Sequence, residues 1–135
     1  MERLKQILLK IFAWWHGPTP GTLLSTRRFG TRVGEDEFGN VYYRGGPDGE
    51  GYERRWVHYA GENDPTTVPP GWHGWMHHRT DVPPSEEAYV APSWVQPHRP
   101  NMTGTPLAYR PPGSLAHPEP REKTGSGEYD AWTPG

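Results

Sequence analysis

The chain has 135 residues, a net charge of −2 and no cysteine. The length allows one domain, and the lack of Cys excludes disulfides, thiolate zinc ligands and thiol catalysis. The balanced charge gives no electrostatic footprint for nucleic acid. Only 32% of residues are apolar, and 17 Gly and 17 Pro make up about a quarter of the chain. Aromatic residues nevertheless reach 13%, more than disordered chains carry, so we expect a small folded core with irregular extensions.

Residues 1–16 form the longest stretch without Gly or Pro, and their apolar residues recur at helical spacing. These residues are Leu4, Ile7, Leu8, Ile11, Phe12 and Trp15. The spacing predicts an amphipathic helix over residues 2–15, ended by Gly17 and Pro18. Such a helix is too short to span a bilayer. We expect it to dock on protein or to lie at a membrane interface, where Trp14, Trp15 and the lysines would be favoured.

Three short segments rich in aromatic and β-branched residues follow, at residues 26–33, 40–44 and 52–59. Clusters of Gly, Asp and Asn separate them, which predicts a three-stranded antiparallel β meander. Such a sheet needs a cover for its apolar face, which we expect from the N-terminal helix or a partner. Arg54 and Arg55 are interpreted as solvated strand residues or as rim contacts to an acidic partner.

Residues 56–84 hold three Trp, four His and five Pro within 29 positions. Pro65, Pro69 and Pro70 exclude a regular element over residues 61–70. Residues 71–78 can form a short helical turn with Trp72 and Trp75 on one side. Stiff aromatic side chains on a backbone fixed by Pro are typical of a recognition surface.

The remaining chain is predicted to be a strap. Residues 85–135 contain nine Pro, which favours extended geometry. Its spaced apolar anchors are Tyr89, Trp94, Val95, Leu107, Tyr109, Leu115, Tyr129 and Trp132. The predicted fold class is therefore small α+β, with an N-terminal amphipathic helix, a three-stranded antiparallel β meander and a long Pro-rich irregular C-terminal strap. The predicted divisions are a helix at 1–16, a small β domain with its recognition segment at 21–84, and a partner-ordered tail at 85–135.

The histidines raise the question of catalysis. His73 and His77 are four residues apart and would share a helix face, so Asp64, Glu62 or Asp81 could complete a metal site with them. No known metal spacing carries its full ligand set here, and residues 64–67 are more simply a turn capped by the Asp64 side chain. No nucleophile elbow, phosphate loop or dinucleotide fingerprint is present in the sequence. We therefore expect no catalytic residue, cofactor or metal, with a small His-dependent metal hydrolase and a free ligand-binding module as alternatives.

The recognition segment resembles a known family. Residues 56–59 (WVHY), 64–70 (DPTTVPP) and 72–78 (WHGWMHH), followed by Thr80, Asp81, Pro83 and Pro84, are similar to the signature of a respiratory complex I accessory subunit. This is the NADH:ubiquinone oxidoreductase alpha-subcomplex accessory family whose assembly-factor paralogue is mimitin. The similarity covers residues 21–84 well and continues loosely to residues 129–134.

The resemblance implies a non-catalytic subunit without a cofactor. It would bind the peripheral arm of complex I beside iron–sulfur subunits and neighbouring accessory subunits, stabilising the arm and supporting its assembly. A mimitin-like assembly factor is the alternative, although the retained tail favours the mature subunit. The N-terminus lacks an Arg- and Ser-rich transit peptide. We therefore expect an alphaproteobacterial-type member on the cytoplasmic side of the inner membrane, with the matrix side of the mitochondrial inner membrane as the alternative.

The predicted partner interface combines the aromatic, His and Asp residues of these segments. It comprises Trp14, Trp15, Trp56, His58, Tyr59, Asp64, Trp72, His73, Trp75, His77, Trp94, Tyr129 and Trp132.

Overall fold

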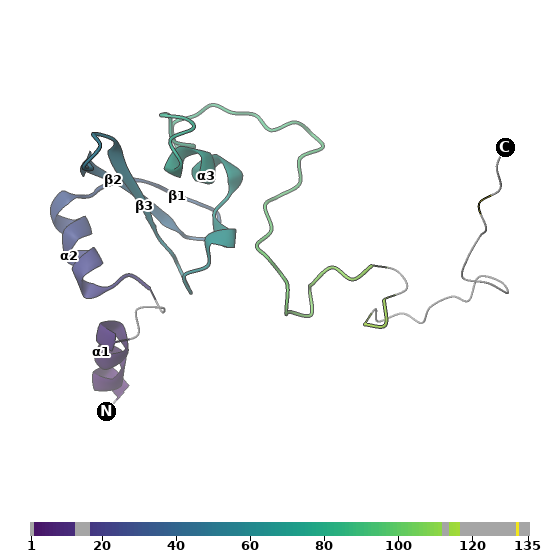
Figure 1. Cartoon of the computed structure of the whole chain (residues 1–135), viewed down its shortest axis with the longest axis horizontal. Coiled ribbons are helices and arrows are strands. Elements are labelled where there is room, and N and C mark those ends of the chain that lie inside the picture. Colours follow the sequence, from purple (N-terminus) through teal and green to yellow (C-terminus); the bar gives the residue numbers. More distant parts are fainter. Residues whose placement is uncertain (1, 13–16, 112–113, 117–131, 133–135) are drawn as a thin grey trace. The chain divides into compact units, whose positions relative to one another are not determined.

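The computed structural model describes residues 2–12, 17–111, 114–116 and 132, without the side chains of residues 6, 10 and 11. Figure 1 shows the elements in these ranges. In chain order they are α1 (Glu2–Phe12), α2 (Pro20–Phe29), β1 (Thr31–Glu35), β2 (Val41–Pro47), β3 (Glu53–His58), the 3-10 turn η2 (Pro65–Thr67) and α3 (Pro70–Met76). The chain divides into two units, residues 1–100 and residues 101–135. The predicted small α+β class is confirmed.

Helix α1 confirms the predicted amphipathic helix over Glu2–Phe12. The end of that prediction, with Trp14 and Trp15, lies outside the described residues, as does Tyr129 of the tail.

Helix α2 corrects the prediction of a strand beginning at Thr26. Thr19 caps the helix by accepting the Thr22 N–H at 3.2 Å, and Pro20 occupies its first turn. Proline suits this position because the N–H that it lacks has no partner inside the helix. Gly30 then ends the helix, and the first strand starts only at Thr31.

The three strands form an antiparallel sheet in the order β1-β2-β3, which confirms the meander. In the central pairing, Tyr42 lies opposite Val57 and Tyr43 lies opposite Trp56. Because side chains alternate between the faces of a sheet, Tyr42 and Tyr43 point in opposite directions. The sheet therefore has two aromatic faces.

Helix α3 covers the first of these faces and completes the core. The Tyr42 and Trp72 rings stack at 4.0 Å between centroids, and Trp75 meets Trp72 edge to face at 5.7 Å. Val68 completes the buried cluster. A Cβ at Gly34 would lie 2.7 Å from the Trp72 ring, so β1 needs glycine where the indole crosses it. The cover expected from the N-terminal helix or a partner is thus supplied by α3.

The second face packs against α2. Thr26 is the buried residue of that helix, and it hydrogen-bonds Trp56 and His58 of β3. A Cβ at Gly45 would lie 2.9 Å from the Trp56 ring, so the indole lies directly on the backbone of β2. After α3, the described residues 77–111, 114–116 and 132 contain turns and extended backbone but neither helix nor strand.

Candidate partner-binding surface

Arg55 fixes helix α3 to the sheet. Its guanidinium donates to the carbonyl oxygens of Trp75 at 2.7 Å and Thr80 at 2.9 Å. It also pairs with Glu53 at 3.0 Å and Asp81 at 3.1 Å. With a side chain only 5% exposed, Arg55 is not the solvated or rim residue that was predicted. It neutralises the carbonyl end of α3, where a cation is favoured.

Asp36 organises the turn between β1 and β2. Its carboxylate accepts hydrogen bonds from the Asn40 amide group at 2.9 Å and the Tyr42 hydroxyl at 2.7 Å. The buried Asn40 side chain also donates to Thr67 Oγ1 at 3.2 Å, and its oxygen accepts the Ala60 N–H at 3.1 Å. Burial and the Asp36 carboxylate both raise the pKa of the Tyr42 phenol. This network joins the first hairpin to η2.

The Trp56 and His58 side chains both contact the hydroxyl group of Thr26. The Trp56 indole N–H donates to Thr26 Oγ1 at 3.0 Å, and His58 Nε2 lies 3.1 Å from the same oxygen. Because the indole can only donate, the Thr26 hydroxyl hydrogen stays available to a His58 Nε2 that carries no proton, while Nε2 would be the donor in the other tautomer. Burial lowers the pKa of His58, which favours that neutral ring. Both predicted interface residues therefore hold α2 on the sheet.

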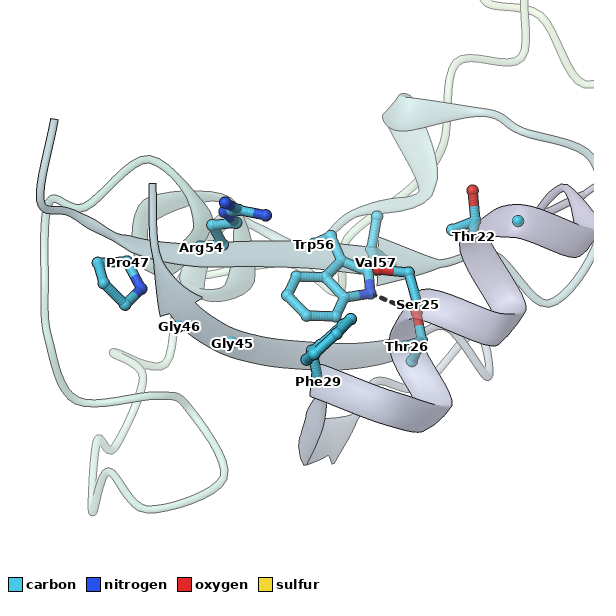
Figure 2. Close-up of a pocket in the computed structure, with 11 residues that line it drawn as sticks. Thr22, Ser25, Thr26, Phe29, Gly45, Gly46, Pro47, Arg54, Trp56 and Val57 are labelled. Atoms are coloured by element: carbon cyan, nitrogen blue, oxygen red, sulfur yellow. Dashed lines mark hydrogen bonds between the residues drawn. The ribbon is translucent and has the colours of Figure 1, made fainter. Parts of the chain in front are cut away.

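A groove of about 690 Å³ runs between α2 and the β2–β3 hairpin. Figure 2 shows Trp56 and Phe29 among the residues that line it, with the Trp56–Thr26 hydrogen bond dashed. Gly45 and Gly46 leave one wall as bare backbone, and Arg54 contributes the charge. The groove can receive an apolar side chain, and sequence reasoning missed it because α2 was predicted to be partly strand.

The clustered histidines do not assemble a metal site with Asp64. The His73 and His77 ring centroids lie 4.2 Å apart, with exposed His73 on α3 and exposed His77 just after its last residue. Asp64 instead accepts the Thr66 N–H at 2.9 Å and its hydroxyl at 2.8 Å, which confirms the predicted capped turn. Across the described residues, no group of three or more His, Asp or Glu side chains could hold a metal ion. His73, His77 and Asp64, the three residues of the alternative hydrolase, therefore do not form such a group.

Trp72 and Trp75 are only 5% and 1% exposed, so their indoles are part of the domain's own core. They cannot offer a partner the large surface that was predicted for them. Tyr59 packs against the same core and is half-buried. Burial, followed by the charge of Asp64, raises the pKa of its phenol. The aromatic density of this segment thus reflects the packing of the domain's own core.

Beyond Asp81, the chain meets the domain at Ser85 and at His98. Ser85 donates its hydroxyl to the Val33 carbonyl oxygen of β1 at 3.2 Å. His98 Nε2 lies 2.7 Å from the carbonyl oxygen of Thr66, and its ring meets Phe38 edge to face. Sequence reasoning missed His98, because nothing local distinguishes it from a solvated histidine.

Exposed aromatic and aliphatic side chains lie between and beyond these two points. Trp94, between Ser85 and His98, is 77% exposed, and Trp132 of the second unit is 80% exposed. The other large exposed residues of this region include Tyr89, Val90, Leu107, Tyr109 and Leu115. Isolated exposed apolar residues are ordinary, but a series on one irregular segment is typical of a chain that binds along another protein.

A small domain that carries such a segment is the form expected of a subunit that binds larger proteins. Residues 30–134 match the family model described as NADH ubiquinone oxidoreductase subunit NDUFA12, and the chain belongs to this family. The resemblance found in the recognition segment is therefore confirmed at the level of the family.

Individual relatives agree with the family match. The chain is 47% identical over 90 residues to NADH dehydrogenase (ubiquinone) 1 alpha subcomplex subunit 12 of Dictyostelium discoideum, covering 65% of this chain and 64% of the relative. It is 34% identical over 122 residues to the probable counterpart of Arabidopsis thaliana, covering 84% and 75%. An uncharacterized Rickettsia prowazekii protein is 50% identical over 52 residues, covering 37% and 52%. The chain spans 58 to 64% of the length of four curated relatives, from Dictyostelium and three animals.

Proposed function

We propose that the chain is a non-catalytic accessory subunit of respiratory complex I that binds and stabilises the peripheral arm. The observation that carries this proposal is the family match over residues 30–134. Relatives that bear the name alpha subcomplex subunit 12 support it. The proposed partners are the iron–sulfur subunits of the arm and neighbouring accessory subunits.

The proposed mechanism is attachment at several linked points. The domain is a rigid part because Arg55, Asn40 and Thr26 tie its elements together. The segment between Ser85 and His98 is fixed at both ends and presents Trp94. Linked anchors bind with a high effective concentration, so weak contacts together give firm attachment. A chain that binds the assembled arm better than its parts favours assembly by mass action.

The proposed interface keeps the residues with accessible side chains. On the domain these are His73 and His77, together with the groove edge beside Trp56. On the extended segments they are Trp94 and Trp132. His58, Tyr59 and Asp64 would act mainly by shaping the surface, since each makes internal contacts.

We place the subunit at the inner face of the respiratory membrane. This is the cytoplasmic side if the chain belongs to a bacterium, for which the Rickettsia relative gives support, and the matrix side if it belongs to a mitochondrion. Within the described residues, no helix combines the length and the apolar character needed to cross a membrane.

The test is purification of the tagged full-length chain from detergent-solubilised membranes of its source, followed by a native gel and identification of the bound proteins. We expect the chain to migrate with a complete complex that oxidises NADH and contains the iron–sulfur subunits. If the chain were present only in smaller, inactive intermediates, the mimitin-like assembly role would replace the proposal. Absence of complex I subunits from the purified material would refute both roles.

A further inference from the structure

Helix α1 presents an apolar face that is open in the structure. Leu4, Ile7, Leu8 and Phe12 are between 46% and 73% exposed. Eleven residues form a helix that is only marginally stable in water unless a packed surface supports it. We therefore expect another surface to cover these four side chains and stabilise the helix.

The charges of α1 indicate what kind of surface this is. At about 100° per residue, the four apolar side chains fall within an arc of roughly 140°. Arg3 lies about 40° beyond one edge of this arc, and Lys5 lies about 20° beyond the other. Cations on both borders of an apolar face can extend toward phosphate groups while the apolar side chains enter the acyl region. A protein groove would not by itself require basic residues on both borders.

We propose that α1 lies flat on an anionic lipid bilayer, with Leu4, Ile7, Leu8 and Phe12 in the interfacial layer and Arg3 and Lys5 at the headgroup phosphates. The helix is about 16 Å long, whereas the hydrocarbon core is about 30 Å thick, so α1 lies along the bilayer and does not cross it. The inference deepens the proposed function and rests on it, because it attaches the subunit to the membrane that carries complex I.

The test measures binding of the purified full-length chain to vesicles by co-sedimentation. One set contains only phosphatidylcholine, and the other adds phosphatidylglycerol as the anionic lipid. Leu8→Ser and Leu9→Ser form a matched pair, because both leucines are exposed but Leu9 falls about 60° outside the apolar arc. We expect Leu8→Ser to weaken binding about tenfold or more and Leu9→Ser to change it less than threefold.

Charge is tested with the double variant Arg3→Gln/Lys5→Gln, which should lose roughly thirtyfold in binding to anionic vesicles. Circular dichroism with the anionic vesicles should show added helix in the wild type and in Leu9→Ser. Equal losses for Leu8→Ser and Leu9→Ser, no effect of the double variant, or no binding by the wild type would each overturn the lipid contact.

The two proposals can fail separately. If the chain purifies with complex I but does not bind vesicles, the accessory role remains supported and protein, not lipid, covers α1. A chain that binds anionic vesicles in the predicted pattern but never purifies with complex I would refute the accessory role while leaving the lipid contact supported.

Discussion

Replacing Arg55 with Met tests whether the attachment of helix α3 depends on one buried cation. Methionine keeps most of the apolar volume of arginine but removes the hydrogen bonds to the carbonyl oxygens of Trp75 and Thr80. Such bonds from a charged donor contribute about 1.5 to 3 kcal/mol each. The lower end applies, because the Trp75 carbonyl keeps the His78 N–H at 3.1 Å. We therefore expect a loss of about 3 kcal/mol in the free energy of unfolding.

The Glu53 and Asp81 carboxylates change this expected loss in the free energy of unfolding little. The Glu53 side chain is 39% exposed and that of Asp81 is 94% exposed, so water can replace the guanidinium at both. Exposed ion pairs contribute about 0 to 1 kcal/mol. Small domains have only about 5 to 15 kcal/mol of total stability, so Arg55→Met should leave a fold that is measurable but fragile.

Urea unfolding followed by tryptophan fluorescence measures the effect, and Trp75 is a direct reporter because the Arg55 guanidinium lies 4.8 Å from its ring centroid. Arg54→Met is the matched control: the neighbouring arginine is exposed, so we expect a change within about 0.5 kcal/mol. Arg55→Lys should fall between the two, because one ammonium group cannot reproduce the planar fork of donors. Equal stability of Arg55→Met and Arg54→Met would refute the proposed role of the buried cation.

Three further predictions follow from the structure. Tyr42→Phe removes the hydroxyl bound to Asp36 but keeps the stacked ring. The free energy of unfolding, measured in urea titrations, should therefore fall by about 1.5 to 3 kcal/mol. An unchanged urea midpoint would show that water replaces this hydrogen bond. Because burial lowers the pKa of His58 below its unfolded value of about 6.5, its contribution to stability should be present above pH 6.5 and be lost as pH falls through the folded-state pKa. His58→Gln should flatten this dependence in unfolding curves between about pH 5 and 7.5, and an unaltered slope would assign it to other groups. Trp94→Ala should weaken co-purification with complex I while changing the free energy of unfolding by no more than about 0.5 kcal/mol. Trp75→Ala should lower the free energy of unfolding by about 3 to 5 kcal/mol, because it leaves a cavity in the core. Similar stabilities for the two variants would contradict the assignment of Trp94 to the surface and Trp75 to the core.

Local sequence signals predicted much of this fold. Apolar spacing predicted α1, turn formers predicted the meander, and the Asp64 cap predicted the turn at η2. The signal for α2 was also present, since Thr19 followed by Pro20 is a typical helix start. It was outweighed by the strand-like composition of residues 26–33, where the end of a helix and the start of a strand are separated only by Gly30.

The candidate surface was less predictable, because core and interface aromatics are of the same residue types. Trp72 and Trp75 on a short Pro-flanked helix are typical of an interface, yet in the structure they form the core with Tyr42. Nothing near them in the sequence specifies that pairing, because Tyr42 lies 30 residues before Trp72. Trp94 is exposed and remains a predicted interface residue, because the segment around it forms no core.

The sequence by itself determined the three-stranded meander, the family and the amphipathic character of α1, because these depend on residue types and on spacings within a few turns of chain. Tertiary structure decided which of two adjacent arginines is buried. Strand periodicity requires that Arg54 and Arg55 face opposite sides of the sheet. Only the packing of α3 on one side shows that Arg55 binds the helix end, while Arg54 borders the groove beside α2. Such choices depend on contacts between segments distant in the sequence, and no local pattern encodes them.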